Sequence, residues 1–374
     1  MDTTAPSSRL ISLDVLRGLT VMGMIFVNSM SGVAGGLHAQ VFPILEHERW
    51  QGLHLADLVF PGFLMMMGVS IPMSLGRAKA EHGLTTQEFW RIFWRAVRLV
   101  AAGFILSNIW WFHDFSTPWR LFGVLQRFGL VYLPCAVLFM TTGPRTRLAI
   151  AGFLLIAYWP LCLLPTADGG PADIWVRGHN FVGSIDRVLL GAGHHNYVDG
   201  PDGYDPEGLL GTLPAIAHGL IGIAIGEYIL KHRGRNIAAP LAIAGAVMFA
   251  AGAAWGFVFP VVKDIWSSTF VLTTCGFTTL VLAGLHALLD NRPAGAPNWL
   301  VNIPLAFGIN AIAAYVLHEL ASDMLGWQLL SLPYDWAKTY VGEPTAACIP
   351  VVLFIFLIWF PIDYLRRRGW IIKI

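Results

Sequence analysis

Long apolar stretches alternate with short polar ones along the whole chain. A helix that crosses a membrane needs about 20 apolar residues, and about ten stretches approach this length. They cover residues 13–30, 53–75, 92–111, 119–140, 148–164, 209–230, 238–259, 265–289, 299–320 and 346–364. Because lipid cannot satisfy free backbone N–H and C=O groups, each stretch must be helical. The sequence therefore predicts an all-α, polytopic membrane helix bundle of about ten transmembrane helices.

Basic residues gather in the connections on one side of these helices. The clusters are Arg9, residues 77–98, Arg145 with Arg147, residues 231–235, Arg292 and residues 366–368. Cytoplasmic loops carry such an excess of Lys and Arg. All clusters fall on one side if both termini are cytoplasmic. We expect a single transmembrane domain over residues 1–374, with a long extracytoplasmic loop at residues 165–208.

Composition supports the membrane assignment. Hydrophobic residues make up 56% of the chain and charged residues 13%, and the mean hydropathy is +0.61. These values are too apolar for a soluble domain of 374 residues. Membrane lipids are therefore expected around the protein, and a net charge of +1 gives no reason to expect a nucleic-acid partner. The four cysteines lack zinc-type spacing, so no metal is expected.

Polar side chains inside the predicted helices are costly and are therefore functional candidates. On the predicted topology they lie toward the outer leaflet. They are Asn28, Asp57, Gln126, Arg127, Glu207, Thr212, Lys263, Asp264, residues 267–269, Asn310, His318 and Glu319. Their common depth predicts one extracytoplasmic site.

The segment from Asn28 to Asp57 carries the strongest signal. One apolar stretch ends near Asn28, a polar loop carries His47, and the next helix opens with Asp57. An acid just inside an apolar helix must find a partner, and an imidazolium would suit it. An amide, an imidazole and a carboxylate together could perform proton or acyl transfer. The plainer alternatives are that His47 is an ordinary loop histidine and that Asp57 has a purely structural role.

Short motifs in order along the chain resemble the heparan-α-glucosaminide N-acetyltransferase family of membrane acetyltransferases and its bacterial relatives. They lie at residues 9–18, 26–28, 47–70, 122–127, 204–212 and 309–319. The sequence His-Glu-Arg-Trp-Gln-Gly-Leu from His47 to Leu53 is similar to the family's His-x-x-Trp-(Asn/Gln)-Gly-Leu pattern, and Asn28 corresponds to the family's asparagine. The connection from Asn28 to His47 is several residues longer than in the animal enzymes.

The resemblance implies acetyl transfer from cytosolic acetyl-CoA to the amino group of a glucosamine-type sugar on the extracytoplasmic side. The expected catalytic residues are His47, as base or acyl acceptor, Asn28, as oxyanion donor, and Asp57, which would orient His47. Candidate contacts to acetyl-CoA are Arg17, Gln126, Arg127, Arg95 and Arg98. Candidate contacts to the acceptor sugar are Asp205, Glu207, Asn310, His318 and Glu319.

A multi-pass protein of a bacterial cytoplasmic (inner) membrane is expected, with His47 on the periplasmic side. A homodimer is implied by the resemblance alone. The rival hypothesis is an inner-membrane transporter for N-acetylglucosamine or a related amino sugar, which predicts alternating access, often with internal repeats and broken helices. A membrane scaffold would leave the outer polar residues unexplained.

Overall fold

The computed structural model describes residues 10–191, 197–198, 200–290, 299–327 and 331–372. Within these ranges the chain forms helices and connections and no named strand, which confirms the all-α prediction. The helices divide between two compact units. Unit 1 comprises Met1–Val41, Gly234–Gly245 and Thr278–Lys373, and unit 2 comprises Phe42–Arg233 and Ala246–Phe277.

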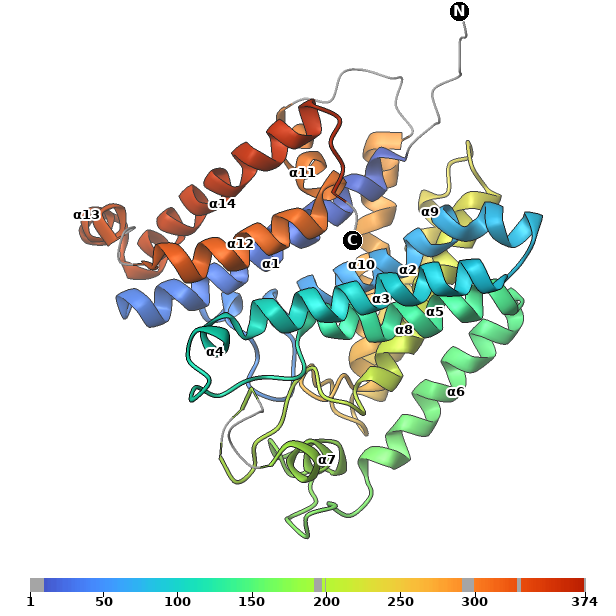
Figure 1. Cartoon of the computed structure of the whole chain (residues 1–374), viewed down its shortest axis with the longest axis horizontal. Coiled ribbons are helices and arrows are strands. Elements are labelled where there is room, and N and C mark those ends of the chain that lie inside the picture. Colours follow the sequence, from blue (N-terminus) through green and yellow to red (C-terminus); the bar gives the residue numbers. More distant parts are fainter. Residues whose placement is uncertain (1–9, 192–196, 199, 291–298, 328–330, 373–374) are drawn as a thin grey trace, which may run out of the picture. The chain divides into compact units, whose positions relative to one another are not determined.

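Most of unit 2 is built from consecutive helices (Figure 1). They are α2 (Ala56–Glu81), α3 (Thr86–Ser107), α4 (Ile109–His113), α5 (Val124–Thr141), α6 (Pro144–Cys162), α7 (Phe181–Leu190) and α8 (Thr212–Lys231). Unit 1 contains α1 (Ile11–Leu37), a π-helix at His286–Asp290, α11 (Trp299–Ile309), α12 (Ala311–Leu325), α13 (Ser331–Val341) and α14 (Glu343–Arg367). Parts of α9 (Ala238–Trp255) and α10 (Ser268–Leu285) belong to each unit.

The described residues include seven helices long and apolar enough to cross a membrane, namely α1, α2, α5, α8, α9, α10 with its π-helical end, and α14. Helices α11 and α12 pass the same test only as a pair bent by 90°, which would make an eighth span. The other two predicted stretches fold largely as α3 and α6, whose arginines make them less apolar. The count of ten spans and the orientation of the termini therefore stay predictions.

Glycines let α2 and α8 approach closely in the core of unit 2. A Cβ atom added at Gly68 would lie 2.3 Å from the carbonyl oxygen of Gly219, and one at Gly222 would lie 2.5 Å from that of Met65. Small residues allow this backbone contact between membrane helices. The contact positions the beginning of α2, which carries Asp57.

Helices α1 and α11 make a similar contact in unit 1. A Cβ atom at Gly18 would meet the carbonyl oxygen of Pro304, and one at Gly308 would meet that of Asp14. The chain then bends at Asn310. The Asn310 side chain accepts a hydrogen bond from the backbone N–H of Ile372 at 3.0 Å and donates one to the carbonyl oxygen of Trp370 at 3.1 Å. The C-terminal segment is thereby fixed at the bend.

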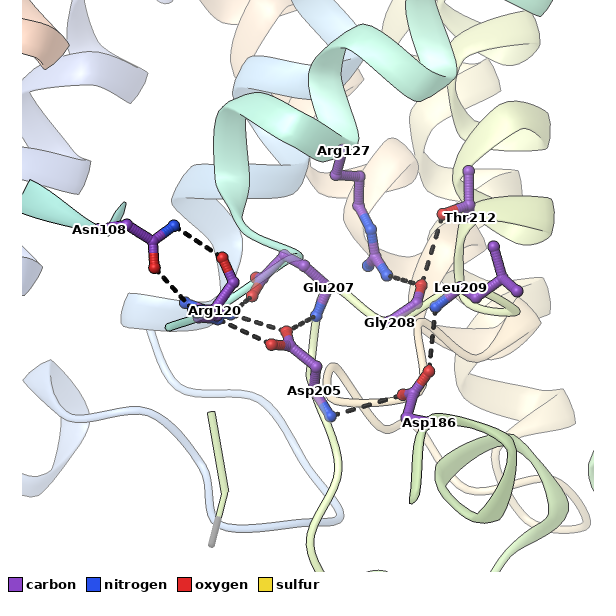
Figure 2. Close-up of polar contacts among 9 residues, drawn as sticks. All are labelled: Asn108, Arg120, Arg127, Asp186, Asp205, Glu207, Gly208, Leu209 and Thr212. Carbon is purple, nitrogen blue, oxygen red and sulfur yellow. Dashed lines mark hydrogen bonds and ion pairs between the residues drawn. The ribbon is translucent and has the colours of Figure 1, made fainter. Parts of the chain in front are cut away.

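The predicted long loop at residues 165–208 contains a helix, α7, whose polar side chains face inward. Arg187 donates to Asp168 at 2.5 Å and to the carbonyl oxygen of Gly203 at 3.2 Å. Asp186 accepts hydrogen bonds from the backbone N–H groups of Leu209 at 3.2 Å and Asp205 at 3.5 Å (Figure 2). These contacts tie α7 to the segment that leads into α8.

Gly222→Ala should destabilise unit 2. The new methyl group meets backbone atoms that cannot move away cheaply, and overpacking of this kind costs about 1–3 kcal/mol. Thermal unfolding in detergent, followed by loss of the monodisperse peak in size-exclusion chromatography, measures the effect. Gly76→Ala is the control, because nothing lies within 4 Å of that Cβ position. Equal melting temperatures for the two variants would contradict the close contact.

Asp186→Asn should change how stability depends on pH. Burial raises the pKa of Asp186 from 3.8 to about 7. Between these values the folded chain holds a proton that the unfolded chain has released, so stability from this group falls as pH rises through the window. The melting temperature of the variant, relative to the unaltered protein, should therefore increase from about pH 5 to about pH 8.

The control for this measurement is Asp335→Asn, at an exposed carboxylate on α13. The melting temperature of Asp335→Asn relative to the unaltered protein should not rise over the same pH range. A difference for Asp186→Asn that stays constant across the pH range would contradict the protonated carboxyl.

Candidate functional site

The loop that carries His47 is fixed to the connection between α9 and α10. The backbone N–H of Gly52 donates to the carbonyl oxygen of Val261 at 2.9 Å, and Gln51 forms an antiparallel bridge with Val262. The indole N–H of the buried Trp50 donates to the carbonyl oxygen of Ile174 at 3.0 Å. The loop is therefore held from two sides.

The carboxylate of Asp57 organises this loop. It is fully buried, with 0% of its side chain exposed, and one oxygen lies 2.8 Å from Nδ1 of His47. The other oxygen accepts the backbone N–H groups of Glu48 and His54, each at 3.0 Å. The structure thus brings Asp57 together with His47.

The contact with Asp57 leaves the far side of the imidazole accessible. When Nδ1 donates its proton to the carboxylate, Nε2 carries the lone pair. The His47 side chain is 37% exposed, so this nitrogen can meet a reactant. Such a pair, a buried acid that orients an exposed imidazole, can perform general-base or nucleophilic chemistry.

Lys263 also faces Asp57. Its Nζ lies 3.6 Å from the same carboxylate oxygen that contacts His47, and its side chain is only 12% exposed. The sequence places Lys263 among the outer polar residues but gives no sign of this contact. The bridge between the two segments joins positions far apart in the chain, so neither spacing nor periodicity could have found it.

The turn that carries Lys263 has an unusual backbone. Trp266 is fully buried and has a φ of 52°, in the left-handed region that non-glycine residues seldom adopt. The backbone N–H of Trp266 donates to the carbonyl oxygen of Lys263 at 2.8 Å, and Ser267 Oγ accepts from the N–H of Val262 at 3.0 Å. Strain of this kind persists only where surrounding contacts enforce it. The turn is therefore a defined support for Lys263.

Tyr204 connects the same turn to the segment before α8. Its hydroxyl donates to Asp264 at 2.5 Å and accepts from Nε of Arg177 at 2.8 Å. Burial and the neighbouring Asp264 carboxylate raise the pKa of the Tyr204 phenol. The Tyr204 ring also meets Trp50 edge to face, with ring centroids 5.9 Å apart. Tyr204 thereby packs against the His47 loop.

A second polar cluster forms around Arg120 (Figure 2). Its guanidinium makes two hydrogen bonds of 2.7 Å to Asp205 and a further one to Glu207. Asn108 accepts from the backbone N–H of Arg120 at 2.7 Å and donates to its carbonyl oxygen at 2.8 Å. The carboxylates predicted to contact the acceptor sugar are thus paired with an arginine that the sequence analysis did not select.

Near the Arg120 cluster, helix α5 begins later than the sequence predicts. Residues 119–140 were predicted as one helix, but α5 begins at Val124. Residues 119–122 read as apolar because of their aromatic and aliphatic side chains, yet Asn108 binds both backbone groups of Arg120 and holds that segment as a connection.

The predicted acetyl-CoA contacts in unit 2 fall into two environments. Arg127 is buried, donates to the carbonyl oxygen of Gly208 at 2.9 Å and lies 4.9 Å from the Trp266 ring centroid. Gln126 is also buried, and its amide atoms have no hydrogen-bond partner among the described residues. Arg95 lies over the Tyr132 ring at 4.8 Å, whereas Arg98 is exposed.

The remaining predicted residues belong to unit 1. Asn28 donates to Glu319 at 3.4 Å, and Nδ1 of the buried His318 lies 3.5 Å from the same carboxylate oxygen. The side chain of Asn310 binds the C-terminal backbone. Arg17 donates to the carbonyl oxygen of Gly308 at 3.3 Å. The structure therefore brings Asn28, His318 and Glu319 together within this unit.

Among the described residues, no group of three or more His, Cys, Asp or Glu side chains is arranged to hold a metal ion.

Comparisons with known proteins agree with the motifs. The sequence model described as "Heparan-alpha-glucosaminide N-acetyltransferase, catalytic" matches residues 9–179. Human heparan-alpha-glucosaminide N-acetyltransferase is 28% identical over 379 residues, covering 86% of this chain and 54% of its own length. The mouse protein of that name is also 28% identical, covering 86% of this chain and 55% of its own length. The chain thus spans about half the length of these curated relatives.

The family match includes His47 and Asp57, and the longer alignments extend over most of both units. The chain is therefore similar to heparan-alpha-glucosaminide N-acetyltransferases, to the family's catalytic region over residues 9–179 and to the human and mouse proteins over most of its length.

Proposed function

We propose that the protein is a transmembrane acetyltransferase. In this proposal it moves an acetyl group from cytosolic acetyl-CoA to the amino group of a glucosamine-type sugar on the extracytoplasmic side of a bacterial cytoplasmic membrane. Membrane-capable helices and the names of the relatives support this reaction class. A homodimer is part of the proposal on the family resemblance alone.

The His47–Asp57 pair carries the proposal. Its imidazole is accessible, and Nδ1 contacts a carboxylate that is itself fixed by two backbone N–H groups. Neutral Nε2 would remove the proton from the attacking amine, or would attack the thioester carbonyl and form an acyl-imidazole. In either route the C–S bond breaks and coenzyme A leaves as the thiol after taking up a proton.

Other residues take supporting roles in this reaction. Asn28 would donate its side-chain N–H to the carbonyl oxygen as negative charge develops there. Phosphates of coenzyme A cannot enter lipid, so the nucleotide would stay near Arg95 and Arg98. Arg17, Gln126 and Arg127 would line the path of the pantetheine arm.

The acceptor sugar would meet the remaining polar residues. Asp205 and Glu207 would bind its ammonium group through the carboxylate oxygens that now hold Arg120. His318 and Glu319, which lie beside Asn28, would contact other groups of the sugar. Asn310 would take part through the bend that its side chain holds.

A transporter for N-acetylglucosamine or a related amino sugar is the second candidate. The specific observation in its favour is the 90° bend between α11 and α12, because discontinuous helices form the binding sites of many transporters. Acidic and histidine side chains also relay protons in transporters, so acetyl transfer is favoured by the His47–Asp57 pair together with the names of the relatives.

His47→Ala should abolish acetyl transfer while leaving the fold intact. General acid–base catalysis contributes about 10²–10⁴-fold, so turnover should fall by about 100-fold or more. The purified protein in lipid vesicles is assayed for release of the coenzyme A thiol from acetyl-CoA, with glucosamine and N-acetylglucosamine as alternative acceptors.

His82→Ala, at an exposed histidine just after α2, should keep full turnover. Turnover with glucosamine that survives in His47→Ala would remove His47 from the mechanism. Absence of turnover in the unaltered protein, combined with uptake of N-acetylglucosamine into the vesicles, would replace the acetyltransferase with the transporter.

A further inference from the structure

We propose that Lys263 is a positioning residue that keeps the His47 imidazole in its neutral form by balancing the charge of Asp57. The catalytic part of this inference rests on the acetyltransferase proposed above. The effect on the charge state of His47 rests on the geometry of the three side chains alone.

The hydrogen bonds of Asp57 show what Lys263 contributes. One carboxylate oxygen is occupied by the backbone N–H groups of Glu48 and His54. The other oxygen faces His47 at 2.8 Å and Lys263 at 3.6 Å. The distance to Lys263 exceeds that of a good hydrogen bond. Lys263 therefore acts on Asp57 mainly through its charge.

The charge of Asp57 has two competing partners. A buried carboxylate with no other cation nearby draws a proton onto an adjacent imidazole, because the ion pair is then more stable than a lone buried charge. An imidazolium has no lone pair, so it can neither accept a proton nor attack a carbonyl carbon. With Lys263 beside the carboxylate, Asp57 already has a counter-charge, and a second positive charge on His47 becomes less favourable.

Other charged groups around the pair have partners of their own. On the loop, Glu48 lies 3.2 Å from Nε2 of His54. On the turn, Asp264 accepts the hydroxyl proton of Tyr204. Among the described residues, His47 and Lys263 are the two side chains that form ion pairs with Asp57. The local charge balance therefore depends on these three groups and on Asp264, whose carboxylate also interacts with the charges of Lys263 and Arg177.

The backbone holds Lys263 in this position. The carbonyl oxygen of Lys263 accepts the N–H of Trp266, whose left-handed conformation closes the turn. The bridge between Gln51 and Val262 joins this turn directly to the His47 loop. Backbone contacts on both sides thus hold the segment that carries Lys263 against the His47 loop.

The test compares Lys263→Met with Lys263→Arg and with Lys338→Met, which removes an exposed lysine of α13. The full-length protein in lipid is treated with diethyl pyrocarbonate, which modifies neutral imidazole, over a range of pH. Mass spectrometry then follows the modification of His47. Cleavage after Glu46 and Arg49 separates His47 from His38 and His54.

The labelling midpoint of His47 should move to higher pH by about one unit or more in Lys263→Met, because the substitution removes the cation 3.6 Å from the carboxylate oxygen that His47 contacts, and a neighbouring charge shifts a pKa by about 1–3 units. Lys263→Arg and Lys338→Met should keep the midpoint of the unaltered protein. The acid side of the pH–rate profile for acetyl transfer should move in the same direction. An unchanged midpoint in a Lys263→Met protein that keeps its melting temperature would overturn the inference.

The two readouts separate this inference from the proposed function. A shifted labelling midpoint in a protein that transfers no acetyl group would reject the acetyltransferase and keep the role of Lys263 in the charge state of His47. Acetyl transfer that falls equally at every pH in Lys263→Met, with an unchanged midpoint, would keep the enzyme and reject that role. If Lys263→Arg keeps the labelling midpoint of the unaltered protein, the shift in Lys263→Met is due to the lost charge and not to a change in the fold of the turn.

Discussion

The buried carboxylate of Asp57 is the interaction on which the candidate site depends. An ionised carboxylate away from water is unstable unless its oxygens receive hydrogen bonds and its charge is balanced. Both requirements are met by neighbouring groups, with backbone N–H groups on one oxygen, and His47 and Lys263 beside the other. The need to satisfy one acid therefore shapes the loop, orients the imidazole and joins the loop to the α9–α10 turn.

Carboxylates with hydrogen-bond and ion-pair partners also organise the segment before α8. Asp205 and Glu207 share Arg120, and the buried Asp186 receives backbone N–H groups from the same segment (Figure 2). These hydrogen bonds tie the described parts of this long polar connection to one another and to the segment that leads into α8. Tyr204, which precedes Asp205 in the chain, contacts both Trp50 and Asp264 and thereby connects this segment to the His47 loop and the Lys263 turn. Side chains at these places are held by polar contacts as much as by apolar packing.

Physical constraints of the membrane made the helices predictable, because each apolar stretch has only one backbone structure open to it. The pairing of Asp57 was predictable too, since its partner lies ten residues away in the sequence and a buried acid needs one. The pairing of Lys263 and the pairing of Arg120 were not predictable, because their partners come from distant connections that have no periodicity. The bend at Asn310 was also missed, as the apolar stretch continues through it unbroken. Sequence patterns locate groups by depth, whereas tertiary contacts decide which of them pair.

The hydrogen bonds of Asp57 also decide where this chain can change in length. His47 lies ten residues before Asp57, and two backbone donors to the same carboxylate, at Glu48 and His54, lie between them. Adding or removing a residue within this interval would pull at least one donor away from the acid. Residues 42–44 are exposed and have no such tie. Between Asn28 and Asp57, insertions should therefore be tolerated better in the connection before Glu46 than in the interval from His47 to Asp57.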